Sequence, residues 1–271
     1  MKKLVLAGAT VAALAFGGPA LAADLPVKAP PIIAPLYDWT GFYVGINGGW
    51  SWGKSDTDLT LVGFPPFSGI GNINGGLVGG QAGYNWQVNS KIVVGVEADV
   101  QKAWQSGTLD VADGPFCVIS GLAAPTRTCV GATVDLHQRL SWFGTGRVRL
   151  GFLPLPHMML YATGGVAFGE VENDVTLNIT TTVTPGPSAT VLAAGSVNNN
   201  RIGWVAGGGV EHALGGLWTA KLEYLFVDYG TFSNTYTLAG VPVLTTSTHL
   251  TDSIIRAGLN YRFGGPVVAK Y

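Results

Sequence analysis

Asp252–Phe263 reads DSIIRAGLNYRF, and its side chains alternate almost without error between two kinds. Successive side chains of a β-strand point to opposite faces, so this pattern predicts a strand with two different faces. One face consists of Ile255, Ala257, Leu259, Tyr261 and Phe263, and the other of Asp252, Ile254, Arg256, Gly258, Asn260 and Arg262. Two arginines on one face and an aromatic pair on the other require two different surroundings.

Seven earlier segments show the same alternation, interrupted by glycine, asparagine or proline. They lie at about 41–53, 77–88, 91–104, 139–150, 158–169, 202–211 and 218–226. Three connections are tight turns, at Asn89–Ser90, Leu153–Pro156 and Gly215–Gly216, whereas those near 53–75, 105–133, 170–200 and 230–248 are each about 20 residues or longer. Short turns at one end and long loops at the other are typical of outer-membrane barrels. The sequence therefore predicts an all-β fold for 39–263: an eight-stranded antiparallel up-and-down transmembrane β-barrel with four long extracellular loops.

The composition is unlike that of an ordinary soluble domain. Charged residues make up 11% of this chain, against about 25% in soluble domains. Hydrophobic residues make up 47%, so few charges are left to cover the surface of a soluble protein. The formal net charge of −1 provides no polybasic surface, and we expect no nucleic acid partner.

The N-terminal part has the features of a secretory signal peptide, which we place at residues 1–22. Lys2 and Lys3 form its basic start, Leu4–Phe16 is an apolar run too short to span a membrane, and Ala20–Ala22 is an A-x-A cleavage site. Residues 23–38 are rich in proline and are expected to form a periplasmic linker, and 264–271 a short periplasmic tail. No later run of about 20 apolar residues exists, so only strands could span a membrane.

The aromatic residues indicate which face meets lipid. One group gathers toward the tight turns: Phe42, Trp86, Phe152, Trp218, Tyr261 and Phe263. A second group gathers toward the long links: Trp50, Trp52, Trp104, Trp142, Phe168, Trp204 and Phe226. Two aromatic belts around an aliphatic band are typical of the two membrane–water interfaces, which places the apolar faces outward. The alternative is a soluble, lipocalin-like barrel with its apolar faces inside.

The polar faces then converge inside the barrel. They carry the charges Glu97, Asp99, Arg139, Arg147, Arg149, Glu211, Lys221, Glu223, Arg256 and Arg262. An unpaired buried ion is costly, so these groups are expected to form pairs or a network. Eight strands leave an interior that side chains can fill, which argues against an open pore.

The two cysteines, Cys117 and Cys129, lie in the same long link. An exported chain with two cysteines is expected to pair them in a disulfide, and two separate free thiols are the alternative. Two cysteines without nearby histidines make a poor zinc site, and the sequence indicates no metal or cofactor.

Several motifs together resemble a known family. They are ADLP and KAPP from Ala23, WTGFYVGINGGW from Trp39, GGQAGYNWQ from Gly79, YATGGVAFG from Tyr161 and RAGLNYRF from Arg256. The chain resembles the small outer-membrane immunogenic proteins of alphaproteobacteria, the RopB-like group often named porin-family proteins. These proteins are similar in architecture to the membrane domain of OmpA.

The resemblance implies a location in the cell outer membrane after Sec-type export, in contact with lipid and lipopolysaccharide. It also implies handling by the barrel-assembly machinery. The last strand resembles the terminal signal read by that machinery, carried here by Arg256, Gly258, Tyr261 and Phe263. Eight residues follow Phe263, a departure from the many outer-membrane proteins that end on this aromatic residue.

We therefore expect a structural outer-membrane barrel with surface-exposed loops and no enzymatic activity. Antigenicity at the cell surface is what the resemblance implies. A small porin for solute diffusion is the alternative. A lipid acyl hydrolase is a third possibility, because His249, Thr251 and Ser253 share the outward face near the barrel rim, but the spacing gives His-x-Thr in place of His-x-Ser.

Overall fold

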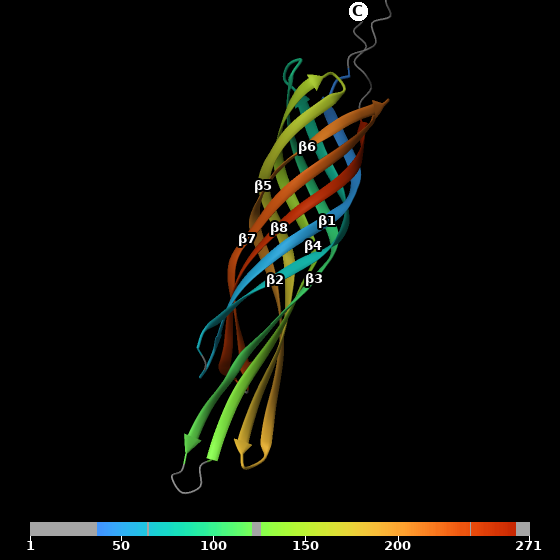
Figure 1. Ribbon diagram of the computed structural model, residues 1–271. Coiled ribbons are helices and arrows are strands. Elements are labelled where there is room, and N and C mark those ends of the chain that lie inside the picture. The colour runs from blue at the N-terminus through green and yellow to red at the C-terminus, as the bar shows by residue number, and fades with distance from the viewer. Residues whose placement is uncertain (1–36, 64, 121–125, 239, 264–271) are drawn as a thin grey trace, which may run out of the picture. The chain divides into compact units, whose positions relative to one another are not determined.

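The computed structural model describes residues 37–63, 65–120, 126–238 and 240–263. The expected signal peptide, most of the linker and the tail lie outside the described residues. Eight antiparallel strands close into one barrel, in which each strand pairs with its neighbours in sequence and the last pairs with the first (Figure 1). The strands are β1 Gly41–Leu61, β2 Phe67–Gln87, β3 Ile92–Ser120, β4 Thr126–Leu155, β5 Met158–Thr184, β6 Ser188–Gly215, β7 Trp218–Leu238 and β8 Val241–Phe263. The predicted fold class is confirmed.

Barrel closure depends on β8, the strand that contains Asp252–Phe263. The register of β8 against β1 runs from Phe42 opposite Phe263 to Leu61 opposite Leu244. This pairing removes the two open edges that a flat eight-stranded sheet would have. Within the described ranges, no helix is long and apolar enough to cross a membrane.

The prediction of long irregular loops in the four links is wrong. The strands continue through most of each link, and β5 and β6, for example, are separated only by the residues between Thr184 and Ser188. In two of the strands a β-bulge also reverses the faces. An extra residue near Ser141 in β4 and near Gly230 in β7 means that odd positions point inward on the barrel side of the bulge and even positions point inward beyond it. Gly230 has a φ of 70°, a left-handed conformation that suits the bulge.

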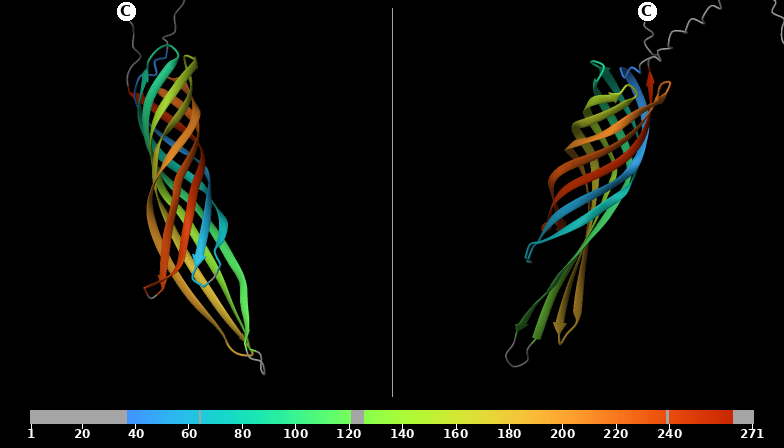
Figure 2. Two further views of the ribbon diagram at one scale, coloured as in Figure 1. Left: turned by 90° about the vertical axis from the view of Figure 1, so that its left-hand side faces the viewer. Right: turned by 45° about the horizontal axis from the view of Figure 1, so that its top comes forward.

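Beyond the barrel the strands separate into two four-stranded sheets, which we call the surface extension. Pairing of β2 with β3 stops at Asn74 opposite Ser106, and pairing of β6 with β7 stops at Trp204 opposite Asp228. One sheet is β7-β8-β1-β2 and the other β3-β4-β5-β6, and the second continues further from the barrel (Figure 2). Between the sheets lies an apolar core that includes Leu59, Leu136, Leu177 and Leu244.

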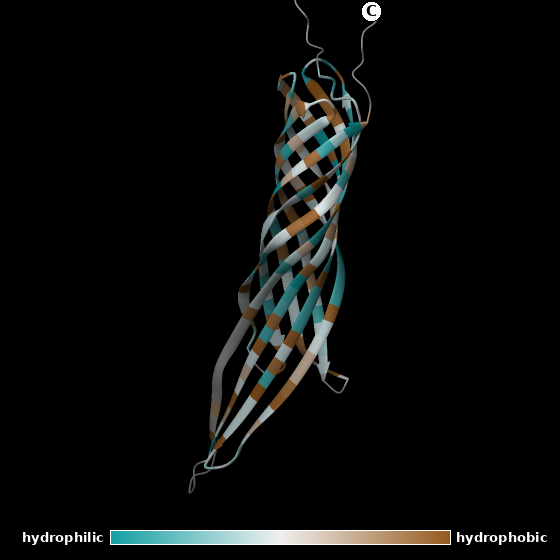
Figure 3. Cartoon of the chain, turned by 90° about the vertical axis from the view of Figure 1, so that its right-hand side faces the viewer, coloured by the Kyte–Doolittle hydropathy of each residue, from teal (hydrophilic) through white to brown (hydrophobic). Residues whose placement is uncertain are grey.

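The apolar faces of the barrel point outward, as predicted. Along each strand, hydrophobic and hydrophilic residues alternate (Figure 3). Outward side chains such as Ile46, Val148 and Leu222 are exposed by 68%, 59% and 54%. The expected belts are visible as ring contacts, with centroids 5.7 Å apart for Phe42 and Phe263 near the short turns and 5.5 Å apart for Trp204 and Phe226 toward the extension.

The barrel interior is filled in layers. Near the short turns, which mark the turn end of the barrel, lies an apolar cluster of Trp39, Val93, Leu153, Met159 and Tyr161. A second apolar cluster, which includes Phe143, Leu225 and Ile254, lies toward the extension. Between the two is a charged layer, which consists of Glu97, Asp99, Arg147, Arg149, Glu211, Lys221, Glu223 and Arg256.

Candidate functional site

The charged layer joins five strands of the barrel. Its members stand at inward positions of β3, β4, β6, β7 and β8, and their side chains are at most 3% exposed. Four cations, Arg147, Arg149, Lys221 and Arg256, face four carboxylates, Glu97, Asp99, Glu211 and Glu223. The layer is therefore neutral when all eight groups are ionised, which is the condition for burying charge at low cost.

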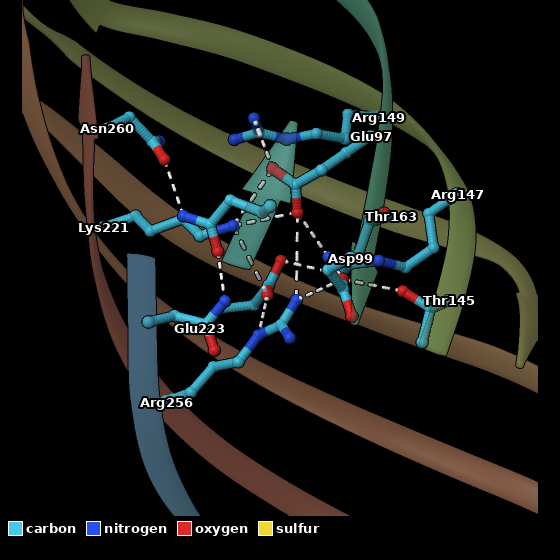
Figure 4. A network of polar contacts seen from close by, with 12 residues as sticks. Glu97, Asp99, Thr145, Arg147, Arg149, Thr163, Lys221, Glu223, Arg256 and Asn260 are labelled. Atoms are coloured by element: carbon cyan, nitrogen blue, oxygen red, sulfur yellow. Dashed lines mark hydrogen bonds and ion pairs between the residues drawn. The ribbon is translucent and has the colours of Figure 1, made fainter. Parts of the chain in front are cut away.

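Arg147 contacts three carboxylates of the charged layer (Figure 4). Its Nη1 donates to Glu223 Oε1 at 2.9 Å and its Nη2 to Asp99 Oδ2 at 2.8 Å. Nη2 also donates to Oε1 of Glu97, the residue directly opposite Arg147 in the β3–β4 ladder. Charge-assisted bonds of this kind are stronger than neutral ones.

Arg149 connects the charged layer to β6 and β1. Its Nη2 donates to Glu211 Oε2 at 2.6 Å, and its Nη1 donates to the Tyr43 hydroxyl at 2.7 Å. The guanidinium also lies 4.0 Å from the ring centroid of Tyr161, within range of a cation–π contact. Nη1 also donates to Glu97 Oε2 at 3.3 Å, so this arginine of β4 contacts groups from four other strands.

Lys221 and Arg256 reach across the interior toward β3. The Lys221 ammonium donates to Glu97 Oε1 at 2.8 Å, although Glu211 is its direct neighbour in the β6–β7 ladder. Arg256 donates through Nε to its neighbour Glu223 at 2.7 Å and through Nη2 to Asp99 at 2.9 Å. These bonds cross the barrel interior and connect β7 and β8 with β3.

Neutral side chains complete the carboxylate hydrogen bonds. Tyr43 donates to Glu97 at 2.7 Å, Thr145 to Asp99 at 2.7 Å and Thr219 to Glu211 at 2.6 Å. Tyr161 donates to Glu223 at 3.1 Å and Asn260 to Glu211 at 2.8 Å. These residues are not among the predicted interior charges, although Tyr43, Thr145, Thr219 and Asn260 lie on the polar face of their own segments.

Arg139 is not an interior charge, and that expectation is wrong. The Arg139 side chain is exposed, and its Nε donates to His137 Nε2 at 2.9 Å. The reason is the bulge at Ser141, which moves the inward positions of β4 from Arg147 and Thr145 to Leu140 and Gln138. Strict alternation across that point placed Arg139 on the wrong face.

Arg262 is buried, as expected, but its bonds differ from the expected ones. Its Nη1 donates to the backbone carbonyls of Asp38 and Thr40, the latter at 3.1 Å, and its guanidinium lies 4.7 Å from the Tyr37 ring centroid. Trp39, which is 1% exposed, donates from Nε1 to the carbonyl of Pro156 at 3.0 Å. The residues just before β1 thus fill the turn end of the barrel.

The proposed assembly residues of β8 have structural contacts of their own. Tyr261 lies 5.1 Å from Trp218 between ring centroids, and Phe263 lies 5.3 Å from Tyr261. Gly258 faces inward, where a Cβ atom would come within 3.2 Å of Lys221 Cε. A larger residue at position 258 would therefore crowd the charged layer.

Cys117 and Cys129 are joined by a disulfide in the structure. They stand directly opposite each other in the β3–β4 ladder, and twelve positions separate them in sequence. The bond lies close to the end of this hairpin, in the part of the surface extension furthest from the barrel.

His249 lies near the barrel rim beside two polar groups. Its Nδ1 is 3.1 Å from Thr231 Oγ1, and its Nε2 is 3.8 Å from Asp228 Oδ1. Ser253 instead accepts a hydrogen bond from the Tyr224 hydroxyl at 3.2 Å. A second threonine–histidine pair, Thr108 with His137, has the same cross-strand arrangement at 3.2 Å.

Known proteins similar to this chain are outer-membrane proteins. The family model described as outer membrane protein beta-barrel domain matches residues 8–263. The 31 kDa outer-membrane immunogenic protein of Brucella melitensis is 34% identical over 272 residues, which cover 97% of this chain and 100% of that protein. The 25 kDa outer-membrane immunogenic protein of Brucella abortus is 28% identical over 268 residues, which cover 97% and 99%.

Solved structures with a similar strand arrangement are more distant. The outer membrane protein OprG from Pseudomonas aeruginosa is 13% identical, with a TM-score of 0.45, and the match covers 85% of this chain and 100% of that chain.

Proposed function

The chain belongs to the outer-membrane β-barrel family, and from that premise we propose that it is a structural protein of the cell outer membrane whose surface extension acts as a surface antigen. The observation that carries the proposal is the filled interior beneath a long extension. Three buried layers occupy the space that a diffusion channel would need. The two Brucella relatives are named as immunogenic proteins, which supports an antigenic role for the extension.

The partners follow from the surface of the barrel. Outward aliphatic and aromatic side chains contact membrane lipid. We propose that lipopolysaccharide surrounds the belt on the extension side and that the barrel-assembly machinery inserts the protein. The short turns then lie in the periplasm and the extension lies outside the cell.

An epitope-insertion experiment tests this orientation. A short peptide tag is inserted in the β5–β6 turn at Gly186 or, as the matched control, in the β2–β3 turn at Ser90. Antibody should label intact cells that carry the Gly186 insertion, and it should label the Ser90 insertion only after the outer membrane is permeabilised. Labelling of intact cells through Ser90 alone would reverse the orientation and remove the surface-antigen role.

The small porin is the second candidate, and planar-bilayer recording separates it from the structural role. Folded protein is identified first by its heat-modifiable mobility on a denaturing gel. When that fraction is added to a planar bilayer, we expect no stepwise conductance, because the charged layer and both apolar clusters block the barrel. Regular conductance steps would contradict the proposal and favour the porin.

We propose that the protein has no hydrolase activity. The histidine–threonine contact at the rim occurs twice, and in the second pair Arg139 donates to the other ring nitrogen of His137. Cross-strand pairing in the ladder explains both contacts without a catalytic role. Release of fatty acid from phospholipid by the folded protein, lost in a His249→Ala variant, would show the opposite.

A further inference from the structure

We propose that one strand edge in the surface extension binds an extended peptide segment of a partner protein by β-strand addition. This edge is Ser188–Asn198 of β6, which we call the free edge. A pocket beside it takes one apolar side chain of the bound segment. The inference goes beyond the surface-antigen role, because it assigns a binding site to a defined part of the extension.

The free edge has a hydrogen-bonded neighbour on one side within the described part of the chain. β6 pairs with β5 from Thr182 opposite Ser188 onward, whereas its pairing with β7 begins only at Trp204 opposite Asp228. In an antiparallel ladder every second residue points its N–H and C=O away from the paired strand. These groups of the free edge are therefore available to another strand.

Contacts closer to the barrel define where the free edge begins. Asn199 Nδ2 donates to Asn234 Oδ1 of β7 at 3.0 Å, and the Arg201 guanidinium lies 4.1 Å from the Phe232 ring centroid. These side chains bridge the gap between β6 and β7. Beyond them, toward Ser188, most β6 side chains are exposed or half-buried.

The opposite edge of the same sheet is blocked, and the free edge is not. The stretch Gly107–Ser120 of β3 contains Asp110, Asp113 and Pro115, and its register shifts between Asp113 and Phe116. Charges, proline and bulges are the features by which proteins prevent pairing at an edge. The free edge reads SATVLAAGSVN and contains neither a charge nor a proline. Of the two edges, only this one is suited to accept a strand.

A pocket of about 200 Å³ lies beside the free edge, in the gap between β6 and β7. Its lining includes Val175 and Leu177 of β5, Val243 and Leu244 of β8, and Ala193–Val197 of β6. Tyr236 is 8% exposed, and its hydroxyl lies near Thr246 without a hydrogen bond of normal geometry. An incoming backbone carbonyl could accept a bond from this hydroxyl.

These features specify the chemistry of the partner. Main-chain bonds along the free edge require an extended segment, and the apolar lining of the pocket requires an aliphatic or aromatic side chain. The uncharged edge favours an uncharged segment. A second copy in the same membrane fits less well, because both β6 strands would run in the same direction and pair in the less stable parallel arrangement.

The test uses a fluorescent synthetic peptide that copies Thr176–Thr184 of β5, TLNITTTVT. This segment is uncharged, and most of it already pairs with β6 on the side of β6 that faces away from the free edge. Binding to folded, detergent-solubilised protein is followed by fluorescence anisotropy. Two further peptides carry N-methyl groups on alternate backbone amides, one on the odd and one on the even positions, so that each loses half of its backbone donors.

We expect saturable binding that one methylation pattern weakens about tenfold or more and the other leaves nearly unchanged, because only alternate amides face the edge. Leu192→Lys, a charge placed on the free edge, should also weaken binding. The matched control Ile119→Lys, on the blocked β3 edge, should not; both wild-type side chains are exposed. Heat-modifiable mobility confirms that each variant is folded.

Three outcomes would overturn the proposal. One is the absence of saturable binding to the folded protein. Another is equal binding of both methylated peptides, which would show that main-chain pairing is not involved. The third is a dimer of the protein that excludes the peptide and dissociates in Leu192→Lys, which would assign the free edge to a second copy.

Discussion

Arg147 shows how one side chain can support the interior of the barrel. Its guanidinium contacts Glu97, Asp99 and Glu223, all of them buried. Arg147→Ala would leave these carboxylates with less positive charge in a place that water does not reach. We expect the free energy of unfolding to fall by about 3–5 kcal/mol, the cost of breaking a buried ion pair by removing one partner. Urea titration of the protein in lipid bilayers measures the change.

The control for this prediction lies on the same strand. Arg139 has the same chemistry but an exposed side chain, so Arg139→Ala should change the unfolding free energy by about 0.5 kcal/mol or less. Equal losses in Arg139→Ala and Arg147→Ala would mean that the charged layer does not stabilise the barrel.

Val148 tests the outer face at a position next to Arg147. Its side chain is 59% exposed in the structure and points toward the lipid. Val148→Arg should lower the unfolding free energy by about 2–4 kcal/mol if the residue lies near the bilayer midplane. Ile119→Arg, in the surface extension, should be harmless because water solvates the new charge. A harmless Val148→Arg would invert the assignment of inner and outer faces.

At the scale of elements, the β3–β4 hairpin consists of the two longest strands and carries the disulfide bond. The Cys117–Cys129 disulfide joins opposite residues of its two strands. Closing a loop of this size should stabilise the hairpin by roughly 3 kcal/mol. A Cys117→Ser, Cys129→Ser variant should therefore be cleaved faster by protease in the hairpin, while the mobility shift of the folded barrel is retained.

Thiol labelling examines the bond directly. Denatured but unreduced protein should contain no reactive thiol, and reduction should expose two. Labelling of both cysteines before reduction would exclude the disulfide in the exported protein.

At the scale of the whole molecule, closure of the barrel depends on the pairing of β8 with β1. We expect the double change Tyr261→Ala, Phe263→Ala to reduce assembly into the outer membrane sharply, because it removes aromatic contacts to Trp218 and Phe42 at the closing strand and the residues that resemble an assembly signal. Deletion of 264–271 should be tolerated. Membrane fractionation compares the two variants with the wild type.

The opposite result would place the assembly signal in the C-terminal tail. If the deletion blocks assembly and the double alanine variant assembles normally, the residues after Phe263 carry the information. A full-length variant with Leu250→Ala, a change elsewhere on β8, controls for a general loss of stability.

The strands of the barrel and their two faces could be predicted from the amino-acid pattern. Side chains of a strand alternate between two faces, and the wall of a closed barrel has only an inner and an outer side. The members of the charged layer, such as Glu97 and Arg256, could therefore be assigned to the interior from the sequence. The expectation failed at Arg139 and in the four long links. At Arg139 the reason is the bulge at Ser141, which adds one residue to β4 and reverses its faces.

Which charges contact each other depends on the tertiary structure. Lys221 stands opposite Glu211 in the ladder but bonds to Glu97 across the barrel, and Arg262 bonds to backbone carbonyls instead of a carboxylate. The same holds for the separation of the extension into two sheets and for the free edge of β6. The alternation of the sequence determines to which side of the sheet a side chain points. Its partner depends on strand register, on barrel curvature and on the space beside glycines such as Gly258, and these three properties are set only when the barrel closes.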